Sequence, residues 1–440
     1  MNKKQRTIFF FAMVIIFLII GPSIIMYSQG YRFDTKKFQF VETGGLYIKT
    51  FPEEVQLYIN DKYINETSFF TRDILVQNLL PDNYNIRIEK DGYHSWEKNL
   101  EIESKKVTEA KYIILFNENI IFNNIESNVS SFYPNNNQIL FLNNSNELLL
   151  YQSGEIEKIL SATQSPDNIE NILFLSNENI IIKTTTGLYY LLDIPNKKTK
   201  LIRSFNIDTK NIQSKDNKLI YQFNNSIYEI DVKKDSPKLI SRDKVDAFTI
   251  DNNSIIALRE NQVIKLYDLT RGEELLYPFE YYDKNSDYQI VFIEKELFII
   301  EDNKNIYFLN KENNSFENKI NAQSELRYTP FFNKILFYDD NNIWLMPLKR
   351  YESPFFEDAY SIINIASFDK KIDIIKWLNG DYFVFTLDKK IYISEIDNRD
   401  NLNMFDLDKN NVSNLFFNGN TKKLYILNDD ELLETEKLIP

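Results

Sequence analysis

Residues 335–346 read ILFYDDNNIWLM, and this stretch decides the fold class. Four apolar residues are followed by four Asp and Asn residues and then by four more apolar residues. Asp and Asn hydrogen-bond their own backbone and tolerate left-handed φ angles, so they supply tight turns. The stretch therefore predicts a hairpin of two apolar strands joined by an Asp/Asn turn.

The same hairpin unit recurs about every 40 residues. Further short apolar runs, such as Ile172–Leu175 and Ile156–Leu160, lie before or after many of the units. Four short strands per roughly 40 residues is the period of a β-propeller blade. The units are Gln138–Tyr151, Asn179–Asp193, Lys218–Asp231, Ser254–Asp268, Glu296–Asn310, Lys334–Leu348, Asp381–Asp397 and Lys422–Glu434.

The eight units predict a β-propeller of about eight blades over residues 118–440, with seven blades as the second choice. The last unit ends close to Pro440, so we expect an earlier strand, from Tyr112–Asn117 or Ile120–Asn123, to complete it and close the ring. Closure matters because each blade buries its two faces only against its neighbours. Two stacked β-sandwiches or a β-solenoid are the alternatives.

An apolar stretch near the N-terminus predicts a membrane anchor. Ile8–Tyr27 has the length of about 20 residues that a helix needs to cross the bilayer core. We therefore expect residues 1–6 to form a short cytoplasmic tail, residues 7–27 a transmembrane helix and residues 28–42 a linker. A cleaved signal peptide is the alternative, although Ser28-Gln29-Gly30 is a weak cleavage pattern.

The orientation of the anchor rests on two arguments, because basic residues on both sides of the span nearly balance the positive-inside count. The tail is short, and long following domains translocate largely regardless of charge. We expect a single-pass protein of the cytoplasmic membrane with its C-terminal body outside the cytoplasm.

Residues 43–117 predict a small antiparallel β-sandwich. Apolar and polar residues alternate in short runs, which Pro, Asn, Asp and Gly separate. In one run Val55, Leu57 and Ile59 share a face, and Asn60-Asp61 follows as a hairpin signal. The whole chain is therefore expected to be all-β apart from the N-terminal helix.

Four motifs of this unit stand in a specific order and spacing. They are Gly45-Leu46-Tyr47-Ile48, a turn opened by Pro52, Leu79-Leu80-Pro81-Asp82-Asn83-Tyr84, and Asp91-Gly92-Tyr93-His94-Ser95-Trp96. Together they resemble the PEGA domain, a small β module of bacterial and archaeal envelope proteins. The resemblance implies structural roles for Gly45, Pro52, Pro81, Tyr84, Asp91, Gly92 and Tyr93.

The resemblance also implies an envelope-associated binding or spacer module with no agreed enzymatic activity. The whole arrangement resembles membrane-anchored PEGA proteins, in which an anchor, a segment like Gly30–Asp34 and this module precede a long β region. The chain departs from the family at the namesake turn, where Pro52-Glu53-Glu54-Val55 lacks Gly-Ala. It also has Asn83 where the family has Gly. Asn can replace Gly where φ is positive.

The composition excludes several kinds of site. The chain has 51 Lys and Arg against 64 Asp and Glu, a net charge of −13, which disfavours nucleic-acid binding. It has no Cys and one His, His94, which excludes thiolate sites and His-rich metal sites and argues against a catalytic triad. We expect no cofactor.

Two kinds of local feature remain as candidate sites. His94 and Trp96, which alternation puts on one face, are a possible ligand-contact patch, but packing of Trp96 in the domain core is the favoured interpretation. The acidic clusters at residues 302–305 and 339–342 lie where hairpins need turns and lack the Gly and distal Glu of a calcium loop. We therefore predict no metal site.

The leading hypothesis is a non-enzymatic, membrane-tethered envelope protein that displays its propeller for interaction with a protein or the cell wall. An envelope hydrolase that uses Asp and Glu carboxylates on glycans is the first alternative, because acidic residues are plentiful, although no spacing selects two of them. A ligand-sensing ectodomain is the second.

Overall fold

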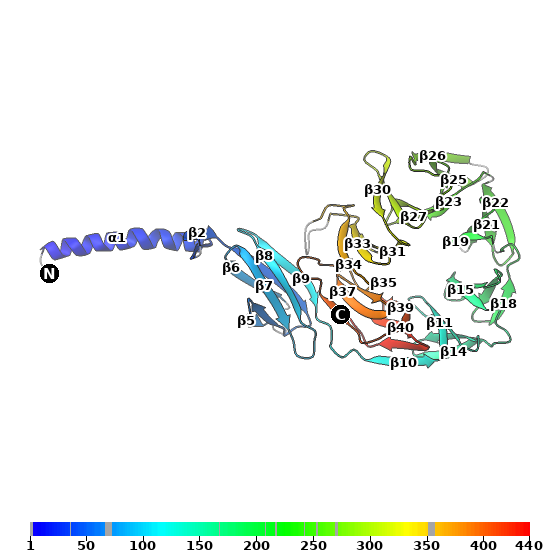
Figure 1. The fold of residues 1–440 in the computed structure, drawn as a ribbon, viewed down its shortest axis with the longest axis horizontal. Helices are drawn as coiled ribbons and strands as arrows, with labels where there is room; N and C mark the ends of the chain where they lie inside the picture. Colours follow the sequence, from blue (N-terminus) through cyan, green and yellow to red (C-terminus); the bar gives the residue numbers. More distant parts are fainter. Residues whose placement is uncertain are drawn as a thin grey trace.

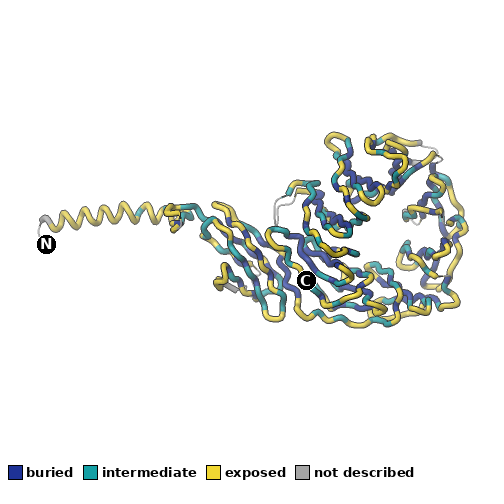
Figure 2. The backbone as a smooth tube through the Cα atoms, in the orientation of Figure 1, coloured by how far each residue is buried: buried dark blue, intermediate teal, exposed yellow. Residues whose placement is uncertain are grey.

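The computed structural model describes residues 3–35, 37–66, 73–166, 168–206, 208–215, 218–241, 243–251, 254–268, 272–350 and 357–440. Helix α1 (Lys3–Ser28) projects from one end of the molecule, a small β domain follows, and a ring of sheets makes up the rest (Figure 1). Among the described residues, one helical segment, Gln5–Ser28, is long and apolar enough to cross a membrane. Most of its residues are exposed, and the helix is therefore yellow along most of its length in Figure 2.

A hairpin joins α1 to the small β domain, within the segment that the sequence analysis treats as a linker. Strands β1 (Tyr31–Asp34) and β2 (Gln39–Glu42) pair antiparallel. Gly30 precedes the hairpin with a φ of +88°, a conformation that favours glycine. The connection is therefore folded from the end of α1 onward.

The small domain is a sandwich of two sheets, with strand orders β6-β3-β9 and β5-β4-β7-β8. Alternating side chains such as Leu46, Leu57, Ile86 and Trp96 fill the core between the sheets. The sandwich confirms the prediction, but its pairing is not wholly antiparallel, because β9 runs parallel to β3. The strands are β3 (Gly44–Phe51), β4 (Gln56–Ile59), β5 (Lys62–Glu66), β6 (Asp73–Leu79), β7 (Asp82–Glu89), β8 (Trp96–Ile102) and β9 (Val107–Ile114).

Eight four-stranded antiparallel sheets of the described residues form the ring and confirm the predicted β-propeller (Figure 1). We number as blades 1–7 the sheets β11–β14 through β35–β38, and blade 8 is β39-β40-β41-β10. The strands are β10 (Phe122–Ser127), β11 (Val129–Pro134), β12 (Ile139–Asn143), β13 (Leu148–Gln152), β14 (Glu155–Leu160), β15 (Ile169–Phe174), β16 (Asn179–Thr184), β17 (Tyr189–Asp193), β18 (Lys198–Leu201), β19 (Lys210–Lys215), β20 (Lys218–Phe223), β21 (Ser226–Asp231), β22 (Ser236–Ser241), β23 (Ala247–Asp251), β24 (Ser254–Arg259), β25 (Gln262–Asp268), β26 (Gly272–Pro278), β27 (Tyr288–Ile293), β28 (Glu296–Glu301), β29 (Asn305–Asn310), β30 (Ser315–Asn321), β31 (Arg327–Phe331), β32 (Lys334–Tyr338), β33 (Asn342–Pro347), β34 (Ile363–Ser367), β35 (Ile372–Trp377), β36 (Tyr382–Leu387), β37 (Lys390–Glu395), β38 (Met404–Asp406), β39 (Val412–Asn418), β40 (Lys423–Asn428) and β41 (Glu431–Thr435).

Blade 8 closes the ring with strands from both ends of the propeller sequence. Strand β10 pairs antiparallel with β41 and supplies the fourth strand of the C-terminal blade. It overlaps the second of the two segments expected to close the ring, whereas Tyr112 belongs to β9 of the small domain. The side-chain Nδ2 of Asn414 in β39 also donates to the Phe132 carbonyl in β11, at 3.4 Å.

A separate hydrophobic core lies between each pair of neighbouring blades. Between blades 8 and 1, for example, Phe132 and Phe141 pack with Tyr425 and Leu432. The central strands are therefore dark blue all round the ring in Figure 2. Each blade hides both faces against its neighbours, which is why its inner strands are continuously apolar.

Asn and Asp occupy left-handed turn positions where other proteins use Gly. Asn60 and Asp61 have φ of 49° and 62°, and Asn224 and Asn225 have φ of 48° and 61°. A two-residue turn with both φ values positive matches the right-handed twist of its strands. These turns explain how so many hairpins form with only 10 Gly.

Candidate functional site

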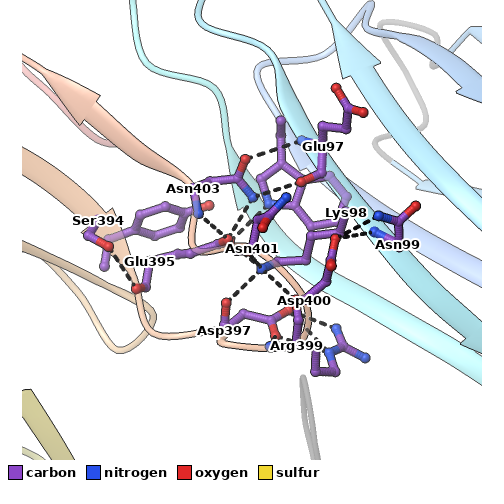
Figure 3. A network of polar contacts seen from close by, with 12 residues as sticks. Glu97, Lys98, Asn99, Ser394, Glu395, Asp397, Arg399, Asp400, Asn401 and Asn403 are labelled. Atoms are coloured by element: carbon purple, nitrogen blue, oxygen red, sulfur yellow. Dashed lines mark hydrogen bonds and ion pairs between the residues drawn. The ribbon is translucent and has the colours of Figure 1, made fainter. Parts of the chain in front are cut away.

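The most elaborate polar site of the molecule lies where the small β domain meets blade 7. Strand β8 is the edge strand of its sheet, since it pairs only with β7. Against this edge lies the loop between β37 and β38, residues 396–403, which we call the docking loop (Figure 3). Unpaired strand edges in a folded protein need a cover, and the docking loop covers this one.

Lys98 is the centre of this site. Along β8, buried and exposed residues alternate strictly, and Lys98 falls on the buried face with an exposed fraction of 0%. Its ammonium is 2.9 Å from Glu395 Oε1. It also donates to the carbonyls of Asp397 at 2.7 Å and Arg399 at 3.0 Å, and to that of Asn401.

Three carbonyls from alternate residues and one carboxylate thus surround a group with three N–H donors. The docking loop folds around the ammonium, as Figure 3 shows. A buried charge is tolerated only when it is paired and hydrogen-bonded, and this arrangement does both. The loop conformation and the position of β8 therefore depend on each other.

Two side chains of the docking loop bind the free backbone edge of β8. The Glu97 amide donates to Asn403 Oδ1 at 3.2 Å, and Asn403 Nδ2 donates back to the Glu97 carbonyl at 3.3 Å. The Asn99 amide donates to Asp400 Oδ2 at 2.8 Å. The Asn403 amide thus repeats the hydrogen bonds of a neighbouring strand and leaves no room there for another chain.

Arg399 extends the contact to the other sheet of the small domain. Its guanidinium donates from Nε and Nη2 to the Asp397 carboxylate and from Nη2 to the Glu109 carbonyl of β9 at 3.0 Å. A planar guanidinium suits this bidentate pairing. The docking loop therefore contacts both sheets of the sandwich.

An apolar contact continues the junction beside the polar one. Phe116, just after β9, packs against Tyr382 and Phe405 with ring centroids 5.3 Å and 5.5 Å apart. Ile114 and Phe116 belong to the same hydrophobic cluster as the cores of blades 7 and 8. The end of the small domain is therefore part of the propeller interior.

Burial determines the electrostatics of the junction. It raises the pKa of the Glu395 carboxyl, and the nearby Lys98 charge opposes this rise. It also raises the pKa of the Tyr382 hydroxyl, which accepts a hydrogen bond from the Ile114 amide at 3.0 Å. The polar groups of the site are buried and hydrogen-bonded to one another, and a fully satisfied buried network favours one conformation.

Of the two residues considered as a ligand-contact patch, Trp96 packs in the sandwich core, as the favoured interpretation predicts, and His94 is partly buried. Trp96 has an exposed fraction of 1%, and its indole N–H donates to Glu395 Oε2 at 2.9 Å. The His94 ring lies 5.3 Å from that of Phe405. Both side chains also contact blade 7 at the junction, a contact that the sequence did not indicate.

The seven residues expected to be structural lie in strands and turns of the small domain. Tyr84 donates from its hydroxyl to the Leu80 carbonyl at 2.9 Å, across the turn that contains Pro81. The peptide bond before Pro52 is cis. Gly45 donates from its amide to the Lys106 carbonyl at 2.9 Å.

The Asp91-Gly92 turn leads into the junction. Gly92 has a φ of +79°, and Tyr93 pairs with Asn117 in an isolated bridge. Of the two adjacent glycines Gly44 and Gly45, the more crowded is Gly44, which the sequence motifs did not include. A Cβ there would lie 2.2 Å from the Glu103 carbonyl, against 3.3 Å from the Val76 carbonyl at Gly45.

Both acidic clusters lie in hairpin turns, and backbone amides donate hydrogen bonds to their carboxylates. Asp339 Oδ1 accepts the amides of Asn341 and Asn342, both at 2.8 Å. Asp302 accepts the Asp287 amide at 2.8 Å. Turn geometry accounts for Asp339, whereas Asp302 joins its turn to the segment before β27.

Two grooves between blades offer surface for a ligand. One, of about 380 Å³, lies at the ring closure between blades 8 and 1 and is lined by Asn137, Gln138, Tyr151, Tyr425 and Glu434 among others. The other, of about 600 Å³, lies between blades 2 and 3. Amide and tyrosine side chains in the first groove provide hydrogen-bond donors, acceptors and flat apolar faces.

Comparisons with known proteins agree with this architecture. Residues 43–114 match the PEGA domain family. The computationally designed Ika8 protein is 11% identical, with a TM-score of 0.50 over 72% of this chain and 98% of its own. The C-terminal WD40 domain of Sif2 is 10% identical, with a TM-score of 0.50 over 73% of this chain and 99% of its own. At these identities the two structures show the fold alone.

A comparison with curated proteins finds no match. The resemblance to the PEGA domain is nevertheless confirmed, because the matched residues are those of the small sandwich. An apolar N-terminal helix, either a membrane span or a signal sequence, precedes this sandwich. The chain thus carries a PEGA domain locked to an eight-bladed β-propeller, a combination that fits an envelope-associated scaffold or binding role.

Proposed function

We propose that this chain is a non-enzymatic envelope protein, anchored in the cytoplasmic membrane by α1, that holds its propeller outside the cytoplasm as a fixed binding platform. The PEGA domain contacts the cell wall or the membrane surface. The propeller offers its grooves to a protein partner or to the cell wall.

The junction around Lys98 carries this proposal. A flexible tether would leave the propeller free to tumble, and interfaces between domains of one chain usually permit motion. Here a fully buried ion pair and a covered strand edge join the two domains. A platform with a fixed position relative to its anchor is what such a joint provides.

The state of the buried carboxylates supports binding over hydrolysis. A glycosidase needs two carboxyl groups that face the substrate. Glu301 accepts hydrogen bonds from the hydroxyls of Tyr288 and Tyr307, at 3.2 Å and 2.7 Å, and Asp339 and Glu395 are held as described above. These carboxylates hold turns and domains in place.

The test uses the full chain in lipid nanodiscs. A photo-crosslinking amino acid replaces Asn137 in the ring-closure groove, and a control replaces Ser145, in the turn at the other end of β12. The discs are incubated with purified cell-wall sacculi and separately with solubilised envelope proteins. We expect sedimentation with sacculi or a discrete protein crosslink from residue 137 and not from 145. Release of soluble glycan or peptide fragments with steady turnover would contradict the proposal.

A further inference from the structure

An exposed aromatic cluster lies directly after α1. Phe33, Phe38 and Phe40 of the β1–β2 hairpin have exposed fractions of 45%, 82% and 48%. Phe33 pairs with Phe40 across the hairpin, and their ring centroids are 5.3 Å apart. Outside α1, the part of the chain that the structure describes exposes one other phenylalanine to this degree, Phe332. Three large rings in one short hairpin form a concentrated apolar surface.

The hairpin is fixed to the end of α1. The Arg32 guanidinium lies 3.5 Å from the centre of the Tyr27 ring and donates to the Tyr27 carbonyl at 2.9 Å. A cation that binds a carbonyl in the last helical turn is favoured by the helix dipole. These contacts join the hairpin, and with it the three rings, to the end of the apolar helix.

The hairpin is also fixed to the PEGA domain. The Thr43 amide and hydroxyl both donate to the Gly30 carbonyl, at 3.0 Å and 2.7 Å. The Lys105 ammonium is 2.7 Å from Glu42 Oε2 at the end of β2. The hairpin is thus bonded to the PEGA domain as well as to α1.

We propose that the three phenylalanines insert into the membrane interface and make the hairpin a second membrane contact that orients the PEGA domain. This proposal rests on the proposed anchorage by α1. If Ile8–Tyr27 spans the bilayer core, the hairpin begins four residues later, in the headgroup layer that adds about 5–8 Å on each side. Aromatic side chains prefer this layer, and lipid is the surrounding medium at that depth.

The experiment exploits the absence of Cys from the chain, which lets one introduced Cys carry a spin label. Lys37→Cys places the label in the hairpin and keeps all three phenyl rings. Ile15→Cys marks the middle of α1, and Phe332→Cys marks an exposed phenylalanine position of the propeller. The full chain is placed in phosphatidylcholine–phosphatidylglycerol nanodiscs, and collision rates with oxygen and with a soluble nickel chelate are compared.

The expected oxygen-to-nickel ratio is highest at residue 15, intermediate at 37 and lowest at 332. In the Lys37→Cys background, replacing the three hairpin phenylalanines by Ser should raise nickel access at residue 37. A ratio at 37 equal to that at 332, with 15 still shielded, would overturn the inference and leave the anchor intact. Nickel access at 15 would overturn both. An unchanged ratio in the triple Ser variant would also refute the role of the rings.

Discussion

Replacing Lys98 by Met is the sharpest perturbation of the domain junction. Met keeps an unbranched side chain of similar length but removes the ammonium, so Glu395 and three loop carbonyls lose their shared donor. Removing one partner of a buried ion pair costs about 3–5 kcal/mol. We expect this cost to weaken the contact between the PEGA domain and the docking loop, because the Lys98 ammonium and its four acceptors lie between them.

Hydrogen exchange of individual amides measures the effect. Among the described residues, the docking loop side chains Asn403 and Asp400 accept the hydrogen bonds of the Glu97 and Asn99 amides, so exchange of these amides reports separation of the domains. At about 1.4 kcal/mol per tenfold change, the expected cost corresponds to exchange faster by about two to three and a half orders of magnitude.

Lys106→Met is the matched control. Lys106 pairs with Glu103 in the same domain, but both side chains are more than half exposed. Exposed ion pairs contribute little, so exchange at Glu97 and Asn99 should be unchanged. A Lys98→Met variant that behaves like this control would refute the assignment of the junction to the buried charge.

The same variant should show a pH dependence. Burial raises the pKa of Glu395 and Lys98 opposes the rise, so loss of Lys98 raises this pKa further. A carboxyl whose pKa is raised in the docked state stabilises docking below its ordinary pKa, and this stability is lost as pH rises through the docked value. The exchange defect of Lys98→Met should therefore shrink from about pH 8 to about pH 5, after correction for intrinsic rates. A defect that grows on acidification would contradict this reasoning.

Three further predictions concern the edge of β8, the two adjacent glycines and the alkaline limit. Asn403→Ala should speed exchange of the Glu97 amide at least tenfold, whereas Asn401→Ala, which keeps the carbonyl that binds Lys98, should not; equal effects would contradict the pairing. Gly44→Ala should lower the urea midpoint of the PEGA domain more than Gly45→Ala, because its Cβ would meet a backbone carbonyl at 2.2 Å; the reverse order would be inconsistent with the packing. Spectrophotometric titration above pH 10 should show a group of tyrosines that ionise later than free tyrosine, together with loss of propeller structure. A tyrosine whose pKa is raised by folding stabilises the propeller below its ordinary pKa of about 10, and this stabilisation is lost as the pH approaches 12. Ordinary titration of every tyrosine would refute this. Burial raises the pKa to about 12 for Tyr151, Tyr221, Tyr288 and Tyr425.

The propeller could be predicted from local sequence because its signal is local. Asp and Asn residues between apolar runs indicate each hairpin, as at residues 335–346. The period of the repeats indicates a propeller, and the number of repeats gives the number of blades. The closing strand was also predictable, since the last of the eight units is short and needs one strand from earlier in the chain. The parallel pairing of β3 and β9 was not predictable in this way, because alternation along a strand does not reveal the direction of its partner.

The junction could not be predicted, because its residues are distant in sequence. Trp96 and Glu395 are 299 positions apart, and no sequence motif links the two residues. One signal was present: Lys98 interrupts the apolar face formed by Trp96, Leu100 and Ile102. A lysine on a buried face needs an acceptor, but a single sequence does not identify it.

A distance measurement across the junction tests the central claim, that the PEGA domain and the propeller form one rigid platform on a membrane anchor. Spin labels at Glu101→Cys in the PEGA domain and Ser145→Cys in blade 1 would be measured by double electron–electron resonance, with the full chain in nanodiscs. We expect one narrow distance distribution, which broadens when Lys98→Met is added. A broad distribution in the chain that retains Lys98 would contradict this claim.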